Sequence, residues 1–211
     1  MADSKSQLEP QLQPKLELWL LRHGATEWAQ NGRHTGRTDL PLLPEGEAQA
    51  RALAPVLARQ RFAAVLVSPL QRARRTAELA GLGADARICP DLQEWDYGSY
   101  EGITTAEIRG QVPGWTVWSH GCPDGESSPQ VEERCRRVIA LAESLAGVLA
   151  ESPVALVAHG HILRSLAGTW LGLGPGGGAL LNLNTATISV LGHERERRTV
   201  VRWNAPVVPA A

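Results

Sequence analysis

The sequence has little lysine, few cysteines and no long apolar run. Lys5 and Lys15 are the only lysines among 21 basic residues, so arginine, whose planar guanidinium suits carboxylates and phosphates, carries nearly all the positive charge. Three cysteines without a Cys-x-x-Cys pair indicate neither a disulfide framework nor a zinc knuckle. No apolar stretch approaches the roughly 20 residues of a membrane span. We therefore expect a cytoplasmic protein that does not associate with membranes.

Charge and length limit the kind of protein further. A net charge of −1, with 43% apolar and 20% charged residues, gives no electrostatic reason for a nucleic-acid partner. The 211 residues suffice for one well-cored domain. Residues 1–15 are polar and lack the apolar core of a signal peptide, so we expect a disordered lead-in. Residues 16–204 should form the domain, and 205–211 a flexible tail.

Short apolar runs predict the strands. Residues 16–21, 63–67 and 154–158 are almost continuously apolar, as expected for strands covered on both faces. Two later segments, "TATISVL" and "TVVRW", predict closing strands that pair as a hairpin at the sheet edge. An exposed edge strand would also allow pairing into a homodimer.

Helical patterns lie between these strands. We expect helices at residues 44–60, where Pro55 should kink or end the helix, and at 69–80, with Ser68 as its cap. Longer helices are expected at 129–151 and in "HGHILRSLAGTWLGL". Strands that alternate with helices predict a single three-layer α/β/α domain with a mostly parallel central sheet and helices on both faces.

The predicted strand ends gather unusual chemistry. Ligands of such sheets bind beyond the carboxyl ends of the strands. Arg22 and His23 follow the first strand, Ser68 and Arg72 follow the second, and His159 follows the run "VALVA". Two arginines and two histidines at one sheet edge predict a strongly positive pocket for an anion, most simply a phosphate ester.

The same residues predict a reaction. A neutral imidazole at His23 can attack phosphorus while the arginines offset the charge of the phosphate oxygens, and His159 can hydrogen-bond the transferring group. The reaction also needs an acid to protonate the departing oxygen. The segment "PDLQEWDYGSYEG" offers Glu94, Asp96 and Glu101. Glu94 is our choice, although periodicity leaves all three open.

Four motifs resemble those of a known family. "LLRHGATEW", "SPLQRARRTAE", "LQEWDYGSYEG" and "VAHGH" are similar, in order and separation, to the motifs of the histidine phosphatase superfamily, in its phosphoglycerate-mutase-like branch. Within that branch, "EWDYGSYEG", "WSHGCPDGES" and "AHGHILR" most resemble a subgroup of sedoheptulose-bisphosphatase-like sugar phosphatases and mycobacterial acid phosphatases.

The resemblance implies a phosphatase that acts on small phosphorylated metabolites such as sugar phosphates or bisphosphates. It implies that His23 becomes a phosphohistidine, that Glu94 is the proton donor, and that Arg22, Arg72 and His159 complete the phosphate pocket. By the same motif positions it implies a substrate site that includes Thr35, Gly36, Tyr97 and Gly160. Arg164 joins that site by resemblance to the sugar-phosphatase subgroup alone.

The sequence departs from the family pattern in two respects. Many relatives have glutamate and asparagine where this chain has Ala25 and Ala29. The segment between residues 103 and 128 is also shorter than a mutase insertion and lacks its arginine and proline clusters. Water should therefore reach the phosphohistidine, and hydrolysis is favoured. A cofactor-dependent phosphoglycerate mutase and a non-catalytic phosphometabolite sensor are the alternatives.

Several residues allow a structural interpretation instead. His159 and His161 lack an accompanying carboxylate or cysteine at metal-ligand spacing, so we expect no metal and no cofactor. Glu101 should fix a loop, and His34 and His120 should lie in loops near the site mouth. The run "GLGPGGGAL" is irregular and is expected to be a flexible loop. Trp115 and Trp118 could cover the substrate or only pack the lid.

Overall fold

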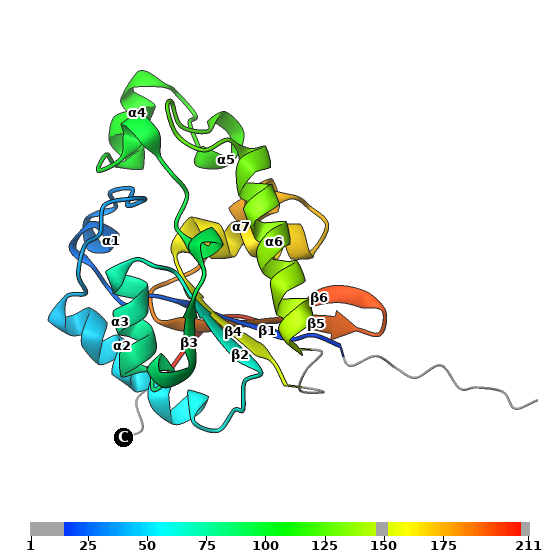
Figure 1. The fold of residues 1–211 in the computed structure, drawn as a ribbon. Helices are drawn as coiled ribbons and strands as arrows, with labels where there is room; N and C mark the ends of the chain where they lie inside the picture. Colours follow the sequence, from blue (N-terminus) through cyan, green and yellow to red (C-terminus); the bar gives the residue numbers. More distant parts are fainter. Residues whose placement is uncertain (1–14, 147–151, 208–211) are drawn as a thin grey trace, which may run out of the picture.

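The computed structural model describes residues 15–146 and 152–207. In these residues, six strands form one sheet in the order β3-β2-β4-β1-β5-β6 (Figure 1). The strands are β1 (Leu18–Arg22), β2 (Ala64–Val67), β3 (Ala86–Ile88), β4 (Val154–Ala158), β5 (Thr187–Glu194) and β6 (Arg197–Pro206). β1, β2, β3 and β4 pair in parallel, whereas β5 pairs antiparallel with both β1 and β6. The mostly parallel sheet and the closing hairpin are confirmed.

Helices cover both faces of the sheet. The α-helices are α1 (Glu27–Asn31), α2 (Pro44–Leu57), α3 (Gln71–Leu79), α4 (Thr105–Gln111), α5 (Val117–His120), α6 (Ser128–Ala146) and α7 (Gly160–Trp170). Short 3₁₀ turns are η1 (Gly83–Asp85), η2 (Pro90–Leu92), η3 (Gly98–Tyr100) and η4 (Pro175–Leu180). Figure 1 shows α6 and α7 on one face and α2 and α3 on the other, which confirms the three-layer arrangement.

The alternation of side chains along each strand creates two cores. Leu20 and Leu156 face the core under α6 and α7, while their chain neighbours Leu21 and Val157 face the core under α2 and α3. All four are fully buried. Because successive residues of a strand point to opposite faces, a strand covered on both sides must be continuously apolar, as these are.

The predicted cap of α3 is wrong. The helix begins at Gln71, two residues later than predicted, and its N-cap is Leu70, with no side-chain hydrogen bond. Ser68 lies at the end of β2 and is fully buried, and its hydroxyl lies 2.7 Å from Nε2 of His159. The Ser68 hydroxyl, which the local sequence assigned to a helix cap, therefore has a hydrogen-bond partner from a distant part of the chain.

Three other boundaries differ from the prediction. Pro55 lies inside α2, which ends only two residues later, so the proline terminates the helix rather than kinking it midway. The described part of α6 reaches Ala146, and residues 147–151 of the predicted helix lie outside the described residues. β6 continues to Pro206 and Val207 packs on the core, so the sheet extends past the boundary predicted at residue 204.

The glycine-rich segment is not the flexible loop that was predicted. Residues 175–180 form η4, which packs closely against α7. A Cβ on Gly168 of α7 would lie 2.4 Å from the Gly174 carbonyl oxygen, and one on Gly178 would lie 2.8 Å from that of Arg164. The glycines thus allow two backbones to approach closely.

Candidate active site

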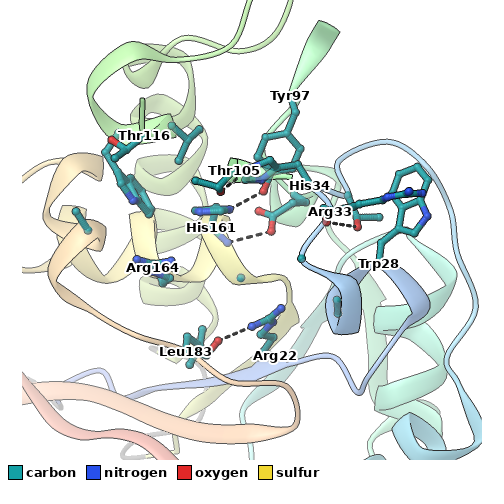
Figure 2. Close-up of a pocket in the computed structure, with 18 of the residues that line it drawn as sticks. Arg22, Trp28, Arg33, His34, Tyr97, Thr105, Thr116, His161, Arg164 and Leu183 are labelled. Carbon is teal, nitrogen blue, oxygen red and sulfur yellow. Dashed lines mark hydrogen bonds between the residues drawn. The ribbon is translucent and has the colours of Figure 1, made fainter. Parts of the chain in front are cut away.

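A cavity of about 470 Å³ lies beyond the carboxyl ends of β1 and β4. Its wall comes from these strand ends, from α1 and the turn after it, and from α4, α5, α7 and η4. Figure 2 shows Arg22, His161 and Arg164 around it, with Trp28 and Arg33 on the opposite side of the view. Its volume is within the range of small-molecule sites.

His23 has the geometry of a nucleophile. It follows β1 directly, and its backbone N–H donates to the Ala158 carbonyl at 3.0 Å. Nδ1 lies 2.7 Å from the Gly24 carbonyl oxygen, which can only accept, so Nδ1 carries the proton and Nε2 keeps its lone pair. Burial lowers the pKa of His23 well below its usual value, and the nearby Arg72 and Arg22 lower it further. The ring is therefore neutral at physiological pH.

Arg22 makes one hydrogen bond to the described part of the chain. Nη1 donates to the Leu183 carbonyl, whereas the buried Nε has no partner among the described residues. Burial lowers the pKa of Arg22, and the carboxylate of Glu94 opposes that shift. A Cβ on Gly160 would lie 3.4 Å from the guanidinium carbon, so Gly160 leaves the room that Arg22 occupies. A buried cation with an unpaired donor indicates an anion as its partner.

His159 and Arg72 lie next to His23 but behind the cavity wall. The His159 ring centroid is 5.1 Å from that of His23, and both His159 and Arg72 are fully buried. Arg72 Nε donates to His159 Nδ1 at 3.1 Å, so the proton of His159 is on Nε2, which donates to the Ser68 hydroxyl. Neither side chain contributes to the wall of the cavity.

Arg72 also holds the loop that follows α1. Its Nη1 donates to the Thr38 carbonyl at 2.9 Å, and its Nη2 donates to the carbonyls of Thr35 at 3.0 Å and Gly36 at 3.2 Å. Burial lowers the pKa of Arg72, and the largest opposing influence is the Glu94 carboxylate. With the bond to His159, four of its five N–H donors have protein partners.

Glu94 is the carboxylate in the cavity wall. It is 8% exposed, and it accepts three backbone N–H bonds, from Trp95 at 2.9 Å, from His161 at 2.9 Å and from Ile162 at 2.8 Å. The last two donors belong to the first turn of α7, whose unpaired N–H groups favour a negative charge. This placement fixes the carboxylate beside Arg22 and Gly160.

The competing acids have structural partners elsewhere. Asp96 pairs with Arg37 at 2.6 Å, and the Glu101 carboxylate accepts the N–H groups of Gly36 and Thr38 at 2.9 and 3.0 Å. Neither Asp96 nor Glu101 lies in the cavity wall. The prediction that Glu101 fixes a loop is confirmed.

The predicted substrate-binding residues divide into two groups. Thr35, Tyr97, Gly160 and Arg164 line the cavity. Gly36 does not, and it is packed so tightly that a Cβ would lie 2.6 Å from the Trp95 carbonyl oxygen. Gly36 could therefore affect substrate binding only indirectly, through the position of the loop in which it is packed.

Tyr97 and Arg164 are held in place by aromatic and imidazole neighbours. The Tyr97 hydroxyl lies 2.6 Å from His161 Nδ1, and burial raises the pKa of Tyr97 well above its usual value (Figure 2). Arg164 Nε donates to the Gly178 carbonyl at 3.0 Å, and its guanidinium lies 4.9 Å from the centre of a Trp118 ring. Burial lowers the pKa of Arg164.

Sequence reasoning missed part of the wall. His161, Trp28, Arg33, Thr105 and Arg109 line the cavity without having been assigned to the substrate site. Trp115 and Trp118, which were expected either to cover the substrate or only to pack the lid, both lie in the wall as well. For two of these residues, the sequence position next to a motif could have indicated a place in the site: Arg33 adjoins "HTG" and His161 adjoins "VAHG".

His34 lies in the loop after α1 and lines the cavity, which confirms the expectation of a loop residue near the site mouth. It is 8% exposed, with Nε2 3.2 Å from the Thr105 hydroxyl. Burial lowers its pKa to about 4. His120 was expected in a loop near the site mouth, but it is the last residue of α5, is exposed and lies outside the cavity wall.

The two alanines that depart from the family pattern occupy different places. Ala29 is in the cavity wall, so the smaller side chain widens the site there. Ala25 is buried; its carbonyl accepts from the Leu43 N–H at 2.9 Å, and its own N–H donates to Oε1 of Gln49 at 3.0 Å. A Cβ on Gly46 would lie 2.1 Å from the Ala25 carbonyl oxygen, so this turn is closely packed.

Within residues 15–146 and 152–207, no three histidine, cysteine, aspartate or glutamate side chains are grouped so that they could hold a metal ion. In the same part of the chain, none of the helices has the length and apolar character needed to cross a bilayer.

The chain belongs to the histidine phosphatase superfamily, because the family model described as "Histidine phosphatase superfamily (branch 1)" matches residues 18–206. It is 41% identical over 179 residues to an acid phosphatase of Mycobacterium tuberculosis, which covers 84% of this chain and 86% of that protein. It is 37% identical over 192 residues to sedoheptulose 1,7-bisphosphatase of Saccharomyces cerevisiae, which covers 78% of this chain and 70% of that protein.

A solved structure agrees with these relatives. The structure of open reading frame Rv3214 from Mycobacterium tuberculosis superposes with a TM-score of 0.85 at 38% identity and covers 92% of this chain and 99% of that one. The family membership and the phosphatase relatives make this protein a phosphomonoesterase.

Proposed function

We propose that the protein is a cytoplasmic, metal-independent phosphatase that hydrolyses small phosphorylated metabolites, such as sugar phosphates or bisphosphates, through a phosphohistidine on His23. The observation that carries the proposal is that His23, Arg22 and Glu94 share one cavity, with the lone pair of His23 on Nε2. A base, a cation and an acid in one small cavity are the groups that phosphoryl transfer needs.

In the first step, His23 Nε2 attacks the phosphorus and the bond from phosphorus to the ester oxygen breaks. The Arg22 donors without protein partners offset the charge on the phosphate oxygens. Glu94 gives a proton to the departing oxygen. A carboxylate has about four lone-pair sites, of which backbone donors occupy two on Oε1 and one on Oε2. The remaining site on Oε2 is where we place the transferred proton.

In the second step, Glu94 takes a proton from water while the water oxygen attacks phosphorus. The bond between phosphorus and Nε2 breaks, the electron pair returns to His23, and inorganic phosphate leaves. The cycle ends with Glu94 protonated and His23 neutral, so the enzyme returns to its starting state.

Two alternatives are weaker. A mutase must keep water from the phosphohistidine, whereas residues 103–128 here contribute only two short helices, α4 and α5, over the cavity. A phosphometabolite sensor would need the arginines but has no use for a carboxylate beside the phosphate. Glu94 in the cavity wall therefore favours catalysis over binding alone.

The test compares phosphate release by the wild type with release by His23→Ala and Glu94→Gln, all with EDTA present. His120→Ala is the matched control, because His120 is exposed and outside the cavity wall. We expect acid-labile phosphate on the wild type and on His120→Ala but not on His23→Ala. Undiminished hydrolysis by His23→Ala would refute the covalent mechanism. Loss of wild-type activity in EDTA would indicate a metal-dependent mechanism. Faster phosphate movement within 3-phosphoglycerate than release to water would establish a mutase.

A further inference from the structure

The cavity carries more positive charge than one phosphate requires. Among the described residues, four arginines line it, namely Arg22, Arg33, Arg109 and Arg164, whereas Glu94 is the acidic residue of the wall. Its three histidines do not add charge, since burial lowers the pKa of His23 and of His161 well below the usual value and that of His34 to about 4. The phosphate to be transferred needs the cations next to His23. The charge on the far wall is not used by the proposed reaction.

Arg33 is directed to the cavity by the way α1 ends. Gly32 has a φ of +79°, a left-handed conformation that suits glycine, and it reverses the chain after one helical turn. The Arg33 N–H then bonds to the Trp28 carbonyl at 3.0 Å, and its backbone bridges to Thr104. Figure 2 shows its side chain beside Trp28, across the view from Arg22 and Arg164.

Arg109 reaches the cavity from the last turn of α4. Its Nε donates to the Trp115 carbonyl at 2.8 Å, which leaves its Nη donors available. Trp115 is itself anchored, because it is buried and its indole N–H donates to the Gly121 carbonyl. Thr105 lies one turn earlier on the same face of α4 and also lines the cavity.

Neither arginine is neutralised by the protein. In the described part of the chain, no carboxylate lies within 4.0 Å of the Arg33 or Arg109 guanidinium. Glu107 is the nearest candidate, since Arg33 contributes to lowering its pKa, but its carboxylate is held by the N–H and hydroxyl of Thr104. Both guanidiniums thus remain free to bind an anion.

We propose that Arg33 and Arg109, the distal arginine pair, bind a second anionic group of the substrate while the phosphate to be removed lies at His23. The preferred substrate is then a small metabolite with anions at both ends, either a bisphosphate or a phosphorylated carboxylic acid. The identity of the substrate rests on the proposed function, whereas the binding site does not depend on turnover.

The kinetic test measures discrimination between matched substrates. Fructose 1,6-bisphosphate is compared with fructose 6-phosphate, and 3-phosphoglycerate with glycerol 3-phosphate, by initial rates in the wild type and in the double variant Arg33→Gln/Arg109→Gln. We expect the double variant to lower the ratio of kcat/KM for the dianionic over the matched singly anionic substrate by at least ~10-fold, because it removes charge-assisted hydrogen bonds to the second anion. The control Arg59→Gln/Arg87→Gln removes the same two charges from exposed positions away from the cavity and should leave the ratio unchanged.

The two comparisons identify the second anion. A ratio that falls only for the bisphosphate assigns the distal group as phosphate, and one that falls only for 3-phosphoglycerate assigns it as carboxylate. Equal losses on both members of each pair, or no change in either ratio, would overturn the distal arginine pair.

A binding measurement separates this proposal from the catalytic one. In the His23→Ala background, calorimetric titration with the same four compounds is repeated with and without the double variant. The second anion should strengthen binding by ~10-fold or more when the distal arginine pair is present and by much less without it. This result would stand even if His23→Ala still hydrolysed substrate and the covalent mechanism fell. Equal affinities with and without the pair would overturn the inference.

Discussion

Replacing Glu94 by glutamine tests the acid role and the anchoring of α7 together. The carboxylate accepts three backbone N–H bonds, of which the one from His161 goes to Oε2. In glutamine this oxygen becomes an NH₂ group, or the flipped amide loses the two bonds at Oε1. At least one buried donor is then left without its acceptor and faces another donor. Such a loss costs about 2 kcal/mol of unfolding free energy, or a fall in Tm of ~6 °C for a protein of this size.

The effect on catalysis separates general acid chemistry from misfolding. An alkyl phosphate such as glycerol 3-phosphate has a strongly basic leaving oxygen that must be protonated, whereas p-nitrophenolate can leave without a proton. In Glu94→Gln we expect kcat/KM to fall by ~1,000-fold for glycerol 3-phosphate and by only ~10-fold for p-nitrophenyl phosphate. The ratio kcat/KM is the relevant quantity, because it reports the steps up to phosphoryl transfer and is unaffected by the later hydrolysis.

The matched control is Glu133→Gln, which removes the same charge from an exposed position on α6. This variant should have the same kcat/KM for both substrates and the same Tm as the wild type. If kcat/KM of Glu94→Gln fell equally for both substrates, Glu94 would be a structural anchor of α7 and not the acid. The proton would then have to come from another group.

Three further changes test single features. Ser68→Ala leaves the buried His159 Nε2–H without an acceptor, so kcat should fall at least ~10-fold and the unfolding free energy by about 2 kcal/mol; unchanged values would show that the bond is dispensable. Gly178→Ala places a Cβ 2.7 Å from an indole carbon and should lower the Tm, whereas Gly176→Ala, with open space around it, should not; equal melting temperatures would contradict the close packing of η4. His34 has a pKa of about 4 when folded and takes up protons below pH ~6.5 when unfolded, so its stabilising effect is complete above that pH and is lost as the pH falls towards 4. From pH 7 to pH 5 the wild type should lose about 2 kcal/mol more than His34→Gln in denaturation experiments, and parallel pH profiles would refute this.

Local sequence patterns predicted the main strands and helices because the pattern of apolar residues within each segment determines which kind of element it forms. The run at residues 154–158 matches β4, since a strand covered on both faces must be apolar throughout and His159 ends the run. The same logic failed at Ser68. A serine before a proline indicates a helix cap, but here the hydroxyl lies within reach of a buried histidine 91 residues away in sequence. No local pattern carries that information.

The part of the candidate site that lies at the strand ends could be predicted from the sequence. Parallel strands bring their carboxyl ends together, so Arg22, His23 and His159 could be placed at one edge. The far wall could not be derived in this way. Arg33 reaches it only because Gly32 turns the chain back, and Arg109 only because α4 folds over the cavity from a distant segment.

The sequence places Arg22 and Arg72 alike, as cations that follow predicted strands, but the structure gives them different hydrogen-bond partners. Arg72 has committed four of its five donors to His159 and to three carbonyls of the loop after α1. At most one N–H is left for a phosphate, so its main effect must be to hold Thr35 and the His159 ring in place. Within the described residues, Arg22 has one donor bonded to the protein and a buried Nε without a partner. In the proposed reaction, the substrate phosphate is the anion that Arg22 binds, and His23, the next residue, attacks that same phosphate.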